Sequence, residues 1–195
     1  MTRERVAIGL RVKTARATAI AVTGTAQKPR VLERRELTLY DPDVPHSGQP
    51  YHLELELPAK QAAPLLERAL EAVRAAGARE LRSLVESLAA PGREVRAVGL
   101  VAGSLGDPEK LGNPHVRAHA REGQLYWKVL DAAAESLGVG CSVVTETEIW
   151  AHAAKSLGRK PDALRGTLAE WGRELGRPWG AEEKCAALAA WVALR

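Results

Sequence analysis

The stretch VAIGLRVKTARATAIAV, residues 6–22, decides the fold. Its two apolar, partly β-branched runs, Val6–Leu10 and Ala17–Val22, predict two buried strands. The residues between them, Arg11–Arg16, carry three cationic side chains, which is typical of an exposed turn. We therefore expect the chain to open with a strand, a basic turn and a second strand.

The following segment is expected to extend the sheet and then leave it. Val31–Leu39 alternates between apolar and polar residues, which predicts a third, partly exposed strand. Residues 41–50 (DPDVPHSGQP) are rich in proline, aspartate and glycine and predict an irregular loop. His52–Leu57 alternates strictly, so we expect an edge strand there.

Helices and strands then alternate along the chain. Apolar residues at helical spacing after Pro58 predict a helix that Gly77 kinks or breaks and that Pro91-Gly92 ends. The β-branched run Val95–Ala102 predicts a central strand buried on both faces. The remaining expected elements are a helix from Pro114 to about Leu137, a strand over Cys141–Val144, and terminal helices of which the last two begin at Pro161 and Ala181.

Length and composition favour one globular domain over residues 1–195. Apolar residues make up 46% of the chain, which is enough for a packed core rather than a disordered segment. We find no signal peptide and no segment suited to cross a bilayer, so we expect a cytoplasmic protein that does not contact membranes. The net charge of +4 gives a mild preference for polyanions, nucleic acid among them.

The order of the expected elements predicts an α/β fold. A three-stranded meander followed by alternating helices and strands implies a mixed sheet of five to six strands with helices on both faces. This order resembles the ribonuclease H-like fold of junction resolvases, retroviral-type integrases and actin-like ATPases. Residues 6–22 carry part of the resemblance, and Glu183–Ala189 (EKCAALA) is similar to the terminal helix of the resolvase branch.

The chain departs from that superfamily at the positions that bind metal. Its nucleases need clustered carboxylates, because two divalent cations must bridge the attacking and leaving oxygens of a phosphodiester. Here the first strand continues as Gly9-Leu10-Arg11, and the central strand ends as Val101-Ala102-Gly103-Ser104. Ala186 stands three residues after Glu183. A single carboxylate cannot assemble a two-metal site, so the resemblance implies this fold without its usual cleavage reaction.

A helix start within residues 113–123 (NPHVRAHAREG) gathers groups that bind anions, metals or protons. Asn113 is a favoured N-cap, and Pro114 suits the first helical position. His115, His119 and Glu122 then fall on one side of the helix. Histidines four residues apart are used for zinc ligation, and His119 with Glu122 would suit acid–base catalysis.

The metal-binding interpretation stays open at this point. The candidate ligands of a divalent ion are His115 and His119, with Glu122 or the more distant Glu183 as a further ligand, and no other histidine follows at the spacing of a zinc motif. In the other interpretation, both histidines border the core and hydrogen-bond the 103–112 loop. The sequence establishes no cofactor.

A second resemblance involves the same helix. Gln49–His52 (QPYH), Asn113–His115 (NPH) and Arg117–His119 (RAH) are similar to motifs in a group of bacterial proteins to which we can assign no activity. This resemblance therefore adds no chemistry. Tyr51 and His52 would either fold over the site as a lid or pack at the margin of the sheet.

The fold class also predicts a basic pocket. In open sheets, ligands bind beyond the carboxyl ends of the parallel strands, and the amide groups at a helix amino terminus favour an anion. The residues expected there to contact phosphate are Arg11, Lys13, Ser104, Asn113, His115 and Arg117.

Three functions compete on this basis. The favoured hypothesis is a non-standard ribonuclease H-like protein that binds a phosphate-rich ligand such as nucleic acid, with His115 and His119 orienting it. The second is a hydrolase that uses His119 and Glu122, with or without a metal ion. The third is a non-catalytic interaction protein that pairs through the edge at His52–Leu57. The sequence leaves catalytic turnover and the oligomeric state open.

Overall fold

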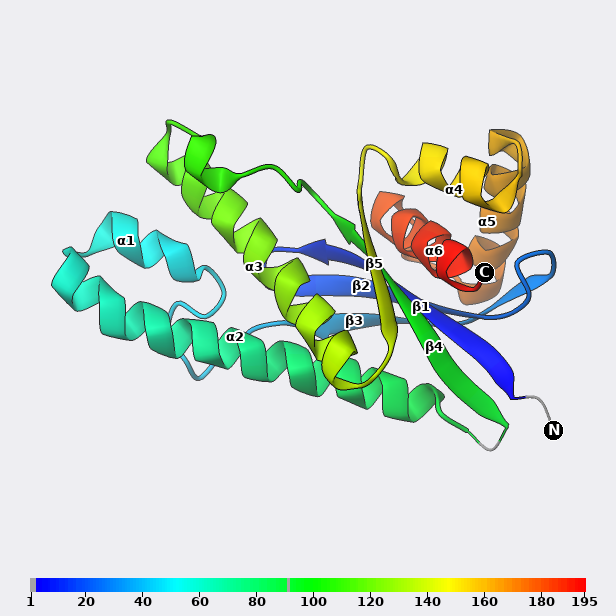
Figure 1. Cartoon of the computed structure of the whole chain (residues 1–195), viewed down its shortest axis with the longest axis horizontal. Helices are drawn as coiled ribbons and strands as arrows, with labels where there is room; N and C mark the ends of the chain where they lie inside the picture. The colour runs from blue at the N-terminus through cyan, green and yellow to red at the C-terminus, as the bar shows by residue number, and fades with distance from the viewer. Residues whose placement is uncertain (1–2, 91) are drawn as a thin grey trace.

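The computed structural model describes residues 3–90 and 92–195 and is built around one five-stranded sheet in the order β3-β2-β1-β4-β5 (Figure 1). The strands are β1 (Glu4–Lys13), β2 (Arg16–Gly24), β3 (Pro29–Thr38), β4 (Arg93–Ala102) and β5 (Gly140–Thr145). The β1–β2 and β2–β3 pairs are antiparallel, whereas the β1–β4 and β4–β5 pairs are parallel. This mixed sheet confirms the predicted fold class, and it brings the carboxyl ends of β1, β4 and β5 to one edge.

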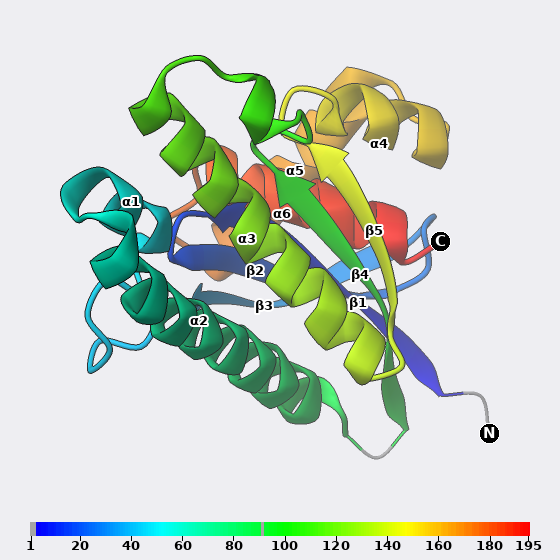
Figure 2. The same ribbon diagram turned by 60° about the vertical axis from the view of Figure 1, so that its left-hand side comes forward.

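Helices cover both faces of the sheet (Figures 1 and 2). One face packs against α2 (Ala59–Leu88) and α3 (Pro114–Ser136), which lie side by side. The other face packs against α4 (Ile149–Leu157), α5 (Pro161–Leu175) and α6 (Ala181–Ala193). Shorter elements are the 3₁₀ helices η1 (Pro50–His52) and η2 (Pro108–Lys110) and the single-turn helix α1 (Leu53–Glu56). None of the helices in the described residues combines the length and apolarity needed to span a membrane.

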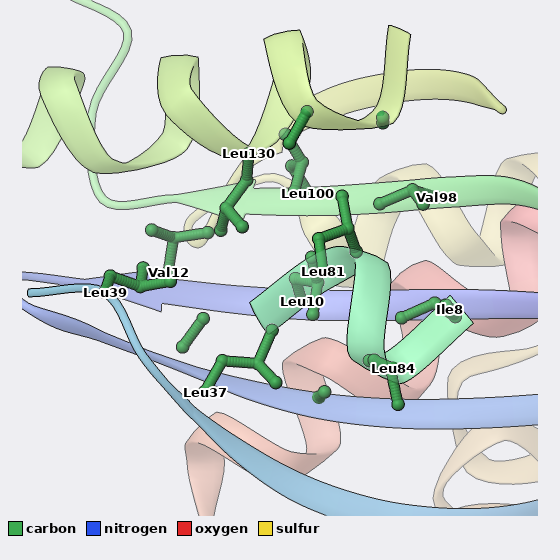
Figure 3. Close-up of a cluster of buried hydrophobic side chains, with 14 of the residues drawn as sticks. Ile8, Leu10, Val12, Leu37, Leu39, Leu81, Leu84, Val98, Leu100 and Leu130 are labelled. Carbon is green, nitrogen blue, oxygen red and sulfur yellow. The ribbon is translucent and has the colours of Figure 1, made fainter. Parts of the chain in front are cut away.

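The core under α2 and α3 is aliphatic, as expected for a chain without phenylalanine (Figure 3). Ile8 and Leu10 of β1 and Leu100 of β4 are fully buried against Leu81 of α2 and Leu130 of α3. Burying each such side chain contributes about 1.5–3 kcal/mol relative to leaving it exposed. These contacts fix α3 over the sheet and therefore determine where its amino end lies.

On the opposite face, α6 approaches the sheet unusually closely. A Cβ atom added at Gly9 of β1 would lie 1.8 Å from the carbonyl oxygen of Ala186, and one added at Gly99 of β4 would lie 2.7 Å from that of Ala189. The alanine-rich face of α6 thus rests directly on the backbone of two neighbouring strands. The terminal helix predicted from Glu183–Ala189 is confirmed, and it is the most buried helix of this layer.

Two predicted connections differ from the structure. The basic turn expected over Arg11–Arg16 is shorter, because Arg11 and Lys13 continue β1 and only Thr14 and Ala15 form the turn. Gly77 does not break α2, which runs without interruption over Ala59–Leu88. Gly77 instead allows close packing against α3, because a Cβ atom added there would lie 2.4 Å from Cγ1 of Val129. Pro91, expected to end this helix, lies outside the described residues.

The prediction of an edge strand over His52–Leu57 is wrong, because the segment forms the end of η1 and the helix α1. Three leucines at alternate positions also suit a single helical turn, and only Leu53 enters the core. Leu55 is 42% exposed, and Leu57 has left the helix with an extended backbone. The segment therefore offers no strand edge for a partner, which removes the basis of the proposed pairing through it.

Candidate functional site

Three histidines from two distant parts of the chain meet at the amino end of α3. His115 and His119 occupy its first two turns, and His52 ends η1, which packs against α3. One ring nitrogen of each lies within 4.8 Å of the others, and the Nε2 atoms of His115 and His119 are 3.1 Å apart. The three rings meet edge to face, with centroids 4.6–5.1 Å apart. This group, called the histidine centre below, could hold a divalent metal ion.

The carboxylate of Glu122 contacts the histidine centre from the protein interior, and its side chain is 0% exposed. Its Oε1 lies 2.8 Å from Nδ1 of His52. Its Oε2 is buried without a hydrogen-bond partner, and Nδ1 of His119 lies 3.6 Å from it. In the neutral tautomer that donates from Nδ1 to this carboxylate, Nε2 of His52 carries the lone pair that a metal ion would need. A carboxylate that orients an imidazole in this way commonly accompanies metal-binding histidines.

Local contacts explain why these segments meet. The Asn113 side chain caps α3 as predicted, since its Oδ1 accepts hydrogen bonds from the backbone N–H groups of His115 (2.9 Å) and Val116 (3.2 Å). Further along α3, the buried hydroxyl of Tyr126 lies 2.8 Å from the carbonyl oxygen of Ser47 and 2.9 Å from that of Gly48. These contacts tie the segment that leads into His52 to the helix that carries the other two histidines.

The structure differs from the sequence interpretation of these histidines in two respects. His115 and His119 are exposed and do not border the core. The missing third histidine is His52, which lies 63 residues before His115, far outside any zinc-motif spacing. Nothing local marks His52 as a partner, and the signal available in the sequence was the joint presence of the QPYH and NPH motifs.

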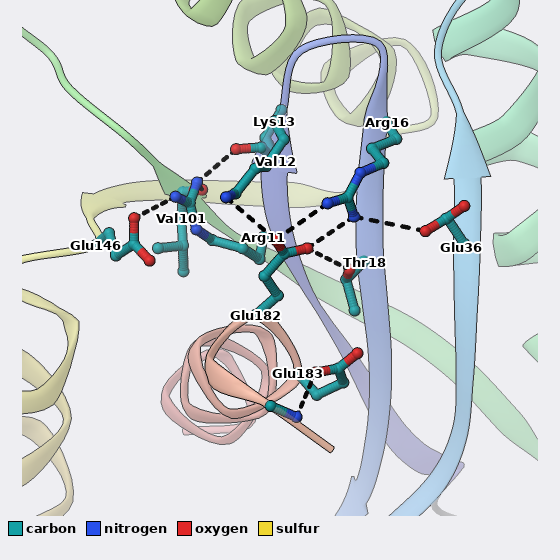
Figure 4. A network of polar contacts seen from close by, with 11 residues as sticks. Arg11, Val12, Lys13, Arg16, Thr18, Glu36, Val101, Glu146, Glu182 and Glu183 are labelled. Carbon is teal, nitrogen blue, oxygen red and sulfur yellow. Dashed lines mark hydrogen bonds and ion pairs between the residues drawn. The ribbon is translucent and has the colours of Figure 1, made fainter. Parts of the chain in front are cut away.

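Two of the cations expected to bind phosphate, Arg11 and Lys13, are instead paired with carboxylates at the sheet edge (Figure 4). Arg11 is only 3% exposed and forms an ion pair with Glu146, which follows β5. Its Nη1 also donates to the carbonyl oxygens of Val12 (2.5 Å) and Val101 (3.3 Å). Because its guanidinium is buried and bonded to these groups, Arg11 is not available to bind a phosphate.

Glu182, at the start of α6, forms ion pairs with the other two cations at this sheet edge. It forms ion pairs with Arg16 (2.7 Å) and Lys13 (3.1 Å), and the hydroxyl of Thr18 lies 3.4 Å away. The hydrogen bonds from Arg16 and Lys13 lower the pKa of the Glu182 carboxyl to about 2. The predicted basic rim is therefore a network of balanced charges, and Lys13 is its most exposed cation.

The remaining predicted site residues do not join the histidine centre. Ser104 Oγ accepts a hydrogen bond from the backbone N–H of Gly106. Arg117 lies two positions from each histidine of α3, hence on the opposite side of that helix, where its Nε donates to the carbonyl oxygen of Leu111. The side chain of Asn113 accepts hydrogen bonds from the backbone N–H groups of His115 and Val116, which were expected to bind an anion.

Glu183 is also separate from the histidine centre. It is 8% exposed, and its Oε2 accepts a hydrogen bond from the backbone N–H of Gly180 at 2.7 Å, which caps α6. Within residues 3–90 and 92–195, no hydrogen bond or ion pair links the sheet-edge network to the three histidines.

The residues at the sheet edge do not fit a two-metal site of the kind that ribonuclease H-like nucleases use. The guanidinium of Arg11 stands at the end of β1, and β4 ends at Ala102. Glu146 and Glu182 are both neutralised by cationic side chains. The two divalent ions implied by the fold resemblance therefore have no ligand set here.

No protein-family model matches the chain, and no curated protein matches its sequence. Among solved structures, Thermus thermophilus RuvC in complex with a Holliday junction substrate is 14% identical, with a TM-score of 0.51, over 96% of this chain and 91% of that chain.

Two further solved structures also match the chain. Another Thermus thermophilus RuvC structure is 14% identical, with a TM-score of 0.50, over 96% of this chain and 92% of that chain. The Ppx/GppA family member of Aquifex aeolicus is 11% identical, with a TM-score of 0.37, over 80% of this chain and 40% of that chain. At 14% identity the two RuvC structures show a likeness of fold alone. The chain thus shares the ribonuclease H-like architecture of the RuvC resolvases.

Proposed function

We propose that this protein is a metal-dependent hydrolase that acts on a phosphate-rich ligand, specifically nucleic acid, through the histidine centre. The observation that carries this proposal is the convergence of His52, His115 and His119 above a buried carboxylate. The proposal takes up the metal-assisted alternative from the sequence, with His52 in place of Glu122 or Glu183 as the third ligand.

The spacing of the imidazole nitrogens suits a tetrahedral ion. Two nitrogens that are each about 2.0–2.1 Å from one zinc ion are about 3.3 Å apart when the angle between them is tetrahedral. The two Nε2 atoms on α3 are 3.1 Å apart, close to this spacing. The ligand nitrogens of all three histidines lie within 4.8 Å of one another, so the rings would have to draw closer for His52 to share the same zinc ion.

The chemistry of this ligand set supports hydrolysis. Three neutral imidazoles leave the full charge on a divalent ion and one coordination position open, as in catalytic zinc sites with three protein ligands. Such an ion lowers the pKa of water to about 7 and polarises a phosphoester. Glu122 would hold the His52 ring in place, since its hydrogen bond fixes which nitrogen carries the proton.

The choice of a phosphate-rich ligand rests on charge and on fold. An ion held by neutral ligands attracts anions, and the chain carries a net charge of +4. The RuvC structure of the same fold was solved with a Holliday junction, and we extend that ligand class, nucleic acid, to this chain. Lys13, which is 42% exposed despite its ion pair, remains the best placed of the predicted phosphate contacts at the sheet edge.

Metal binding is the first test. We expect purified protein to bind one zinc ion per chain in a titration against a chromophoric chelator, and His52→Ala, His115→Ala or His119→Ala to abolish this. His152→Ala is the matched control, because His152 is an exposed histidine on α4 outside the centre. Zinc binding that is absent, or equally strong in the three alanine variants, would refute the proposal.

Turnover and ligand class need a second test. The zinc-loaded protein should hydrolyse an activated phosphodiester and cleave labelled nucleic acid, and both activities should disappear in His119→Ala. If the loaded protein binds nucleic acid with a strong salt dependence but cleaves nothing, the hypothesis of a non-catalytic phosphate-binding protein replaces this one.

A further inference from the structure

A groove of about 500 Å³ opens beside His52, near the turn that joins β1 to β2. Its polar lining consists of Thr14, Tyr40, His46, Gln49, His52 and Glu56. The volume lies within the range of about 300–1,000 Å³ that is typical of small-molecule sites. Because His52 belongs to both the groove and the histidine centre, a molecule bound in the groove would lie directly beside that centre.

The polar side chains of the groove are not used to hold the protein together. Those of Thr14, Tyr40, His46, Gln49 and Glu56 make no hydrogen bond or ion pair with another group in the described residues. The same part of the chain is held by other residues, since Ser47 Oγ donates to the carbonyl oxygen of Asp41 at 2.6 Å and Tyr126 bonds the backbone at Ser47 and Gly48. The hydrogen-bonding capacity of the groove is thus available to a ligand.

The backbone of the groove is strained at two points. Within residues 3–90 and 92–195, the non-glycine residues with a left-handed backbone are Ala15 and His46, both at φ +64°, and both line the groove. Each is held by a main-chain hydrogen bond, from Leu39 N–H to the Ala15 oxygen and from Gln49 N–H to the His46 oxygen. At Ala15 this conformation belongs to the two-residue turn between β1 and β2, where positive φ is common, whereas at His46 it occurs in the irregular segment before η1.

We propose that this groove holds the base of an unpaired nucleotide whose phosphodiester meets the histidine centre. The inference rests on the proposed function and names its substrate as single-stranded nucleic acid. No lysine or arginine of the described chain lines the groove, and Glu56 contributes a negative charge, so the groove repels phosphate. In this arrangement the metal ion would bind the phosphodiester, and the groove would bind the uncharged base.

The lining also suits a particular kind of base. Tyr40 provides an aromatic ring on which a base can stack, which is the usual basis of binding to unpaired nucleotides. The Gln49 amide offers a donor and an acceptor side by side, the pairing that glutamine makes with adenine. The carboxylate of Glu56 only accepts hydrogen bonds and thus favours a base with an exocyclic amino group. Adenine has that group and thymine lacks it.

Binding of short single-stranded oligo-dA and oligo-dT, measured by fluorescence anisotropy, tests this inference. We expect oligo-dA to bind roughly tenfold more tightly than oligo-dT, the size of effect that one well-made base contact gives. Gln49→Ala and Glu56→Ala should remove most of this preference while leaving thermal unfolding unchanged, since both side chains are exposed. Gln27→Ala, in the β2–β3 turn at the other end of the sheet, is the matched control and should keep the preference.

The measurement is made both on chelator-treated protein and on zinc-loaded protein, which separates the inference from the proposed function. A preference for oligo-dA that depends on Gln49 in the metal-free protein supports the groove even if no hydrolysis is found. Equal affinity for the two oligonucleotides, or a preference that survives both variants, overturns the groove even if the zinc-loaded protein hydrolyses a simple phosphodiester.

Discussion

At the scale of single residues, Glu122 connects the interior of the protein to its candidate metal centre. It is a fully buried carboxylate with one hydrogen-bonded oxygen, on His52, and one oxygen without a hydrogen-bond partner. Burying a charge without full pairing is costly, so this arrangement is more easily understood when a cation is bound next to the histidines. The charge of the ion would then offset that of the carboxylate.

Replacing this carboxylate tests its role. Glu122→Gln removes the charge but keeps the shape, and we expect zinc affinity to fall by about 10–100-fold, the usual effect of losing a carboxylate that orients a ligand. Competition with a chelator of known affinity measures the change. Glu109→Gln, which alters an exposed carboxylate paired with Arg121, should leave zinc affinity unchanged. Equal affinities for the wild type and Glu122→Gln would contradict a role in metal binding.

Glu182 gives a residue-scale prediction about stability. Its folded-state pKa of about 2 lies below the ordinary value of 4.5, because Arg16 and Lys13 stabilise the charged form. The resulting stabilisation is fully present above about pH 5 and is lost as the pH falls from 4.5 toward 2. Because the carboxylate is partly solvated, we expect roughly 1–2 kcal/mol from it at neutral pH.

Urea unfolding as a function of pH measures this contribution. The free energy of unfolding of Glu182→Gln should lie below that of the wild type at pH 7, and the two curves should converge as the pH approaches 2. Glu36→Gln is a suitable control, because Glu36 is far more exposed and only its 3.5 Å contact with Arg16 would be lost. A gap between wild type and Glu182→Gln that stays constant across this pH range would show that the ion pairs are not its source.

At the scale of secondary structure, α6 packs closely against the sheet at Gly9 and Gly99. Gly9→Ala would place a methyl group 1.8 Å from the carbonyl oxygen of Ala186, which neither backbone can avoid without moving the helix. We expect a loss of about 3 kcal/mol or more in the free energy of unfolding. Gly166→Ala, in α5 with open space around it, should instead stabilise the protein by about 0.5–1 kcal/mol. Chemical denaturation compares the two, and a similar small effect at both sites would refute the close packing of α6.

The helices and strands were largely predictable from the sequence, whereas the candidate site formed by the three histidines was not. Strands such as β1 and β4 are continuous apolar runs, and the fold follows from their order. The prediction failed for His52–Leu57, where three alternating leucines fit either a strand or a helical turn and the burial of Leu53 decides. The sequence also did not predict that His52 lies beside His115 and His119, because its place next to α3 depends on tertiary contacts made by Tyr126.

At the scale of the whole molecule, the ion pairs of the sheet edge and the histidine centre are two separate clusters of side chains. At the sheet edge, cationic and acidic side chains are joined in ion pairs such as Arg11–Glu146. The histidine centre lies instead where η1 meets α3, outside the sheet. An ion bound there would link the segment that follows β3 to the helical layer, two parts of the chain that separate on unfolding.

This link predicts that zinc stabilises the entire fold. A ligand that binds only the folded state at a hundred times its dissociation constant adds about 2.7 kcal/mol. For a chain of this size that corresponds to a rise of roughly 5–10 °C in Tm, measured by circular dichroism. His52→Ala should lose the rise although it leaves both histidines of α3 in place, and His152→Ala should keep it. A zinc-dependent rise that persists in His52→Ala would mean that the ion binds elsewhere and that η1 and α3 are not joined through it.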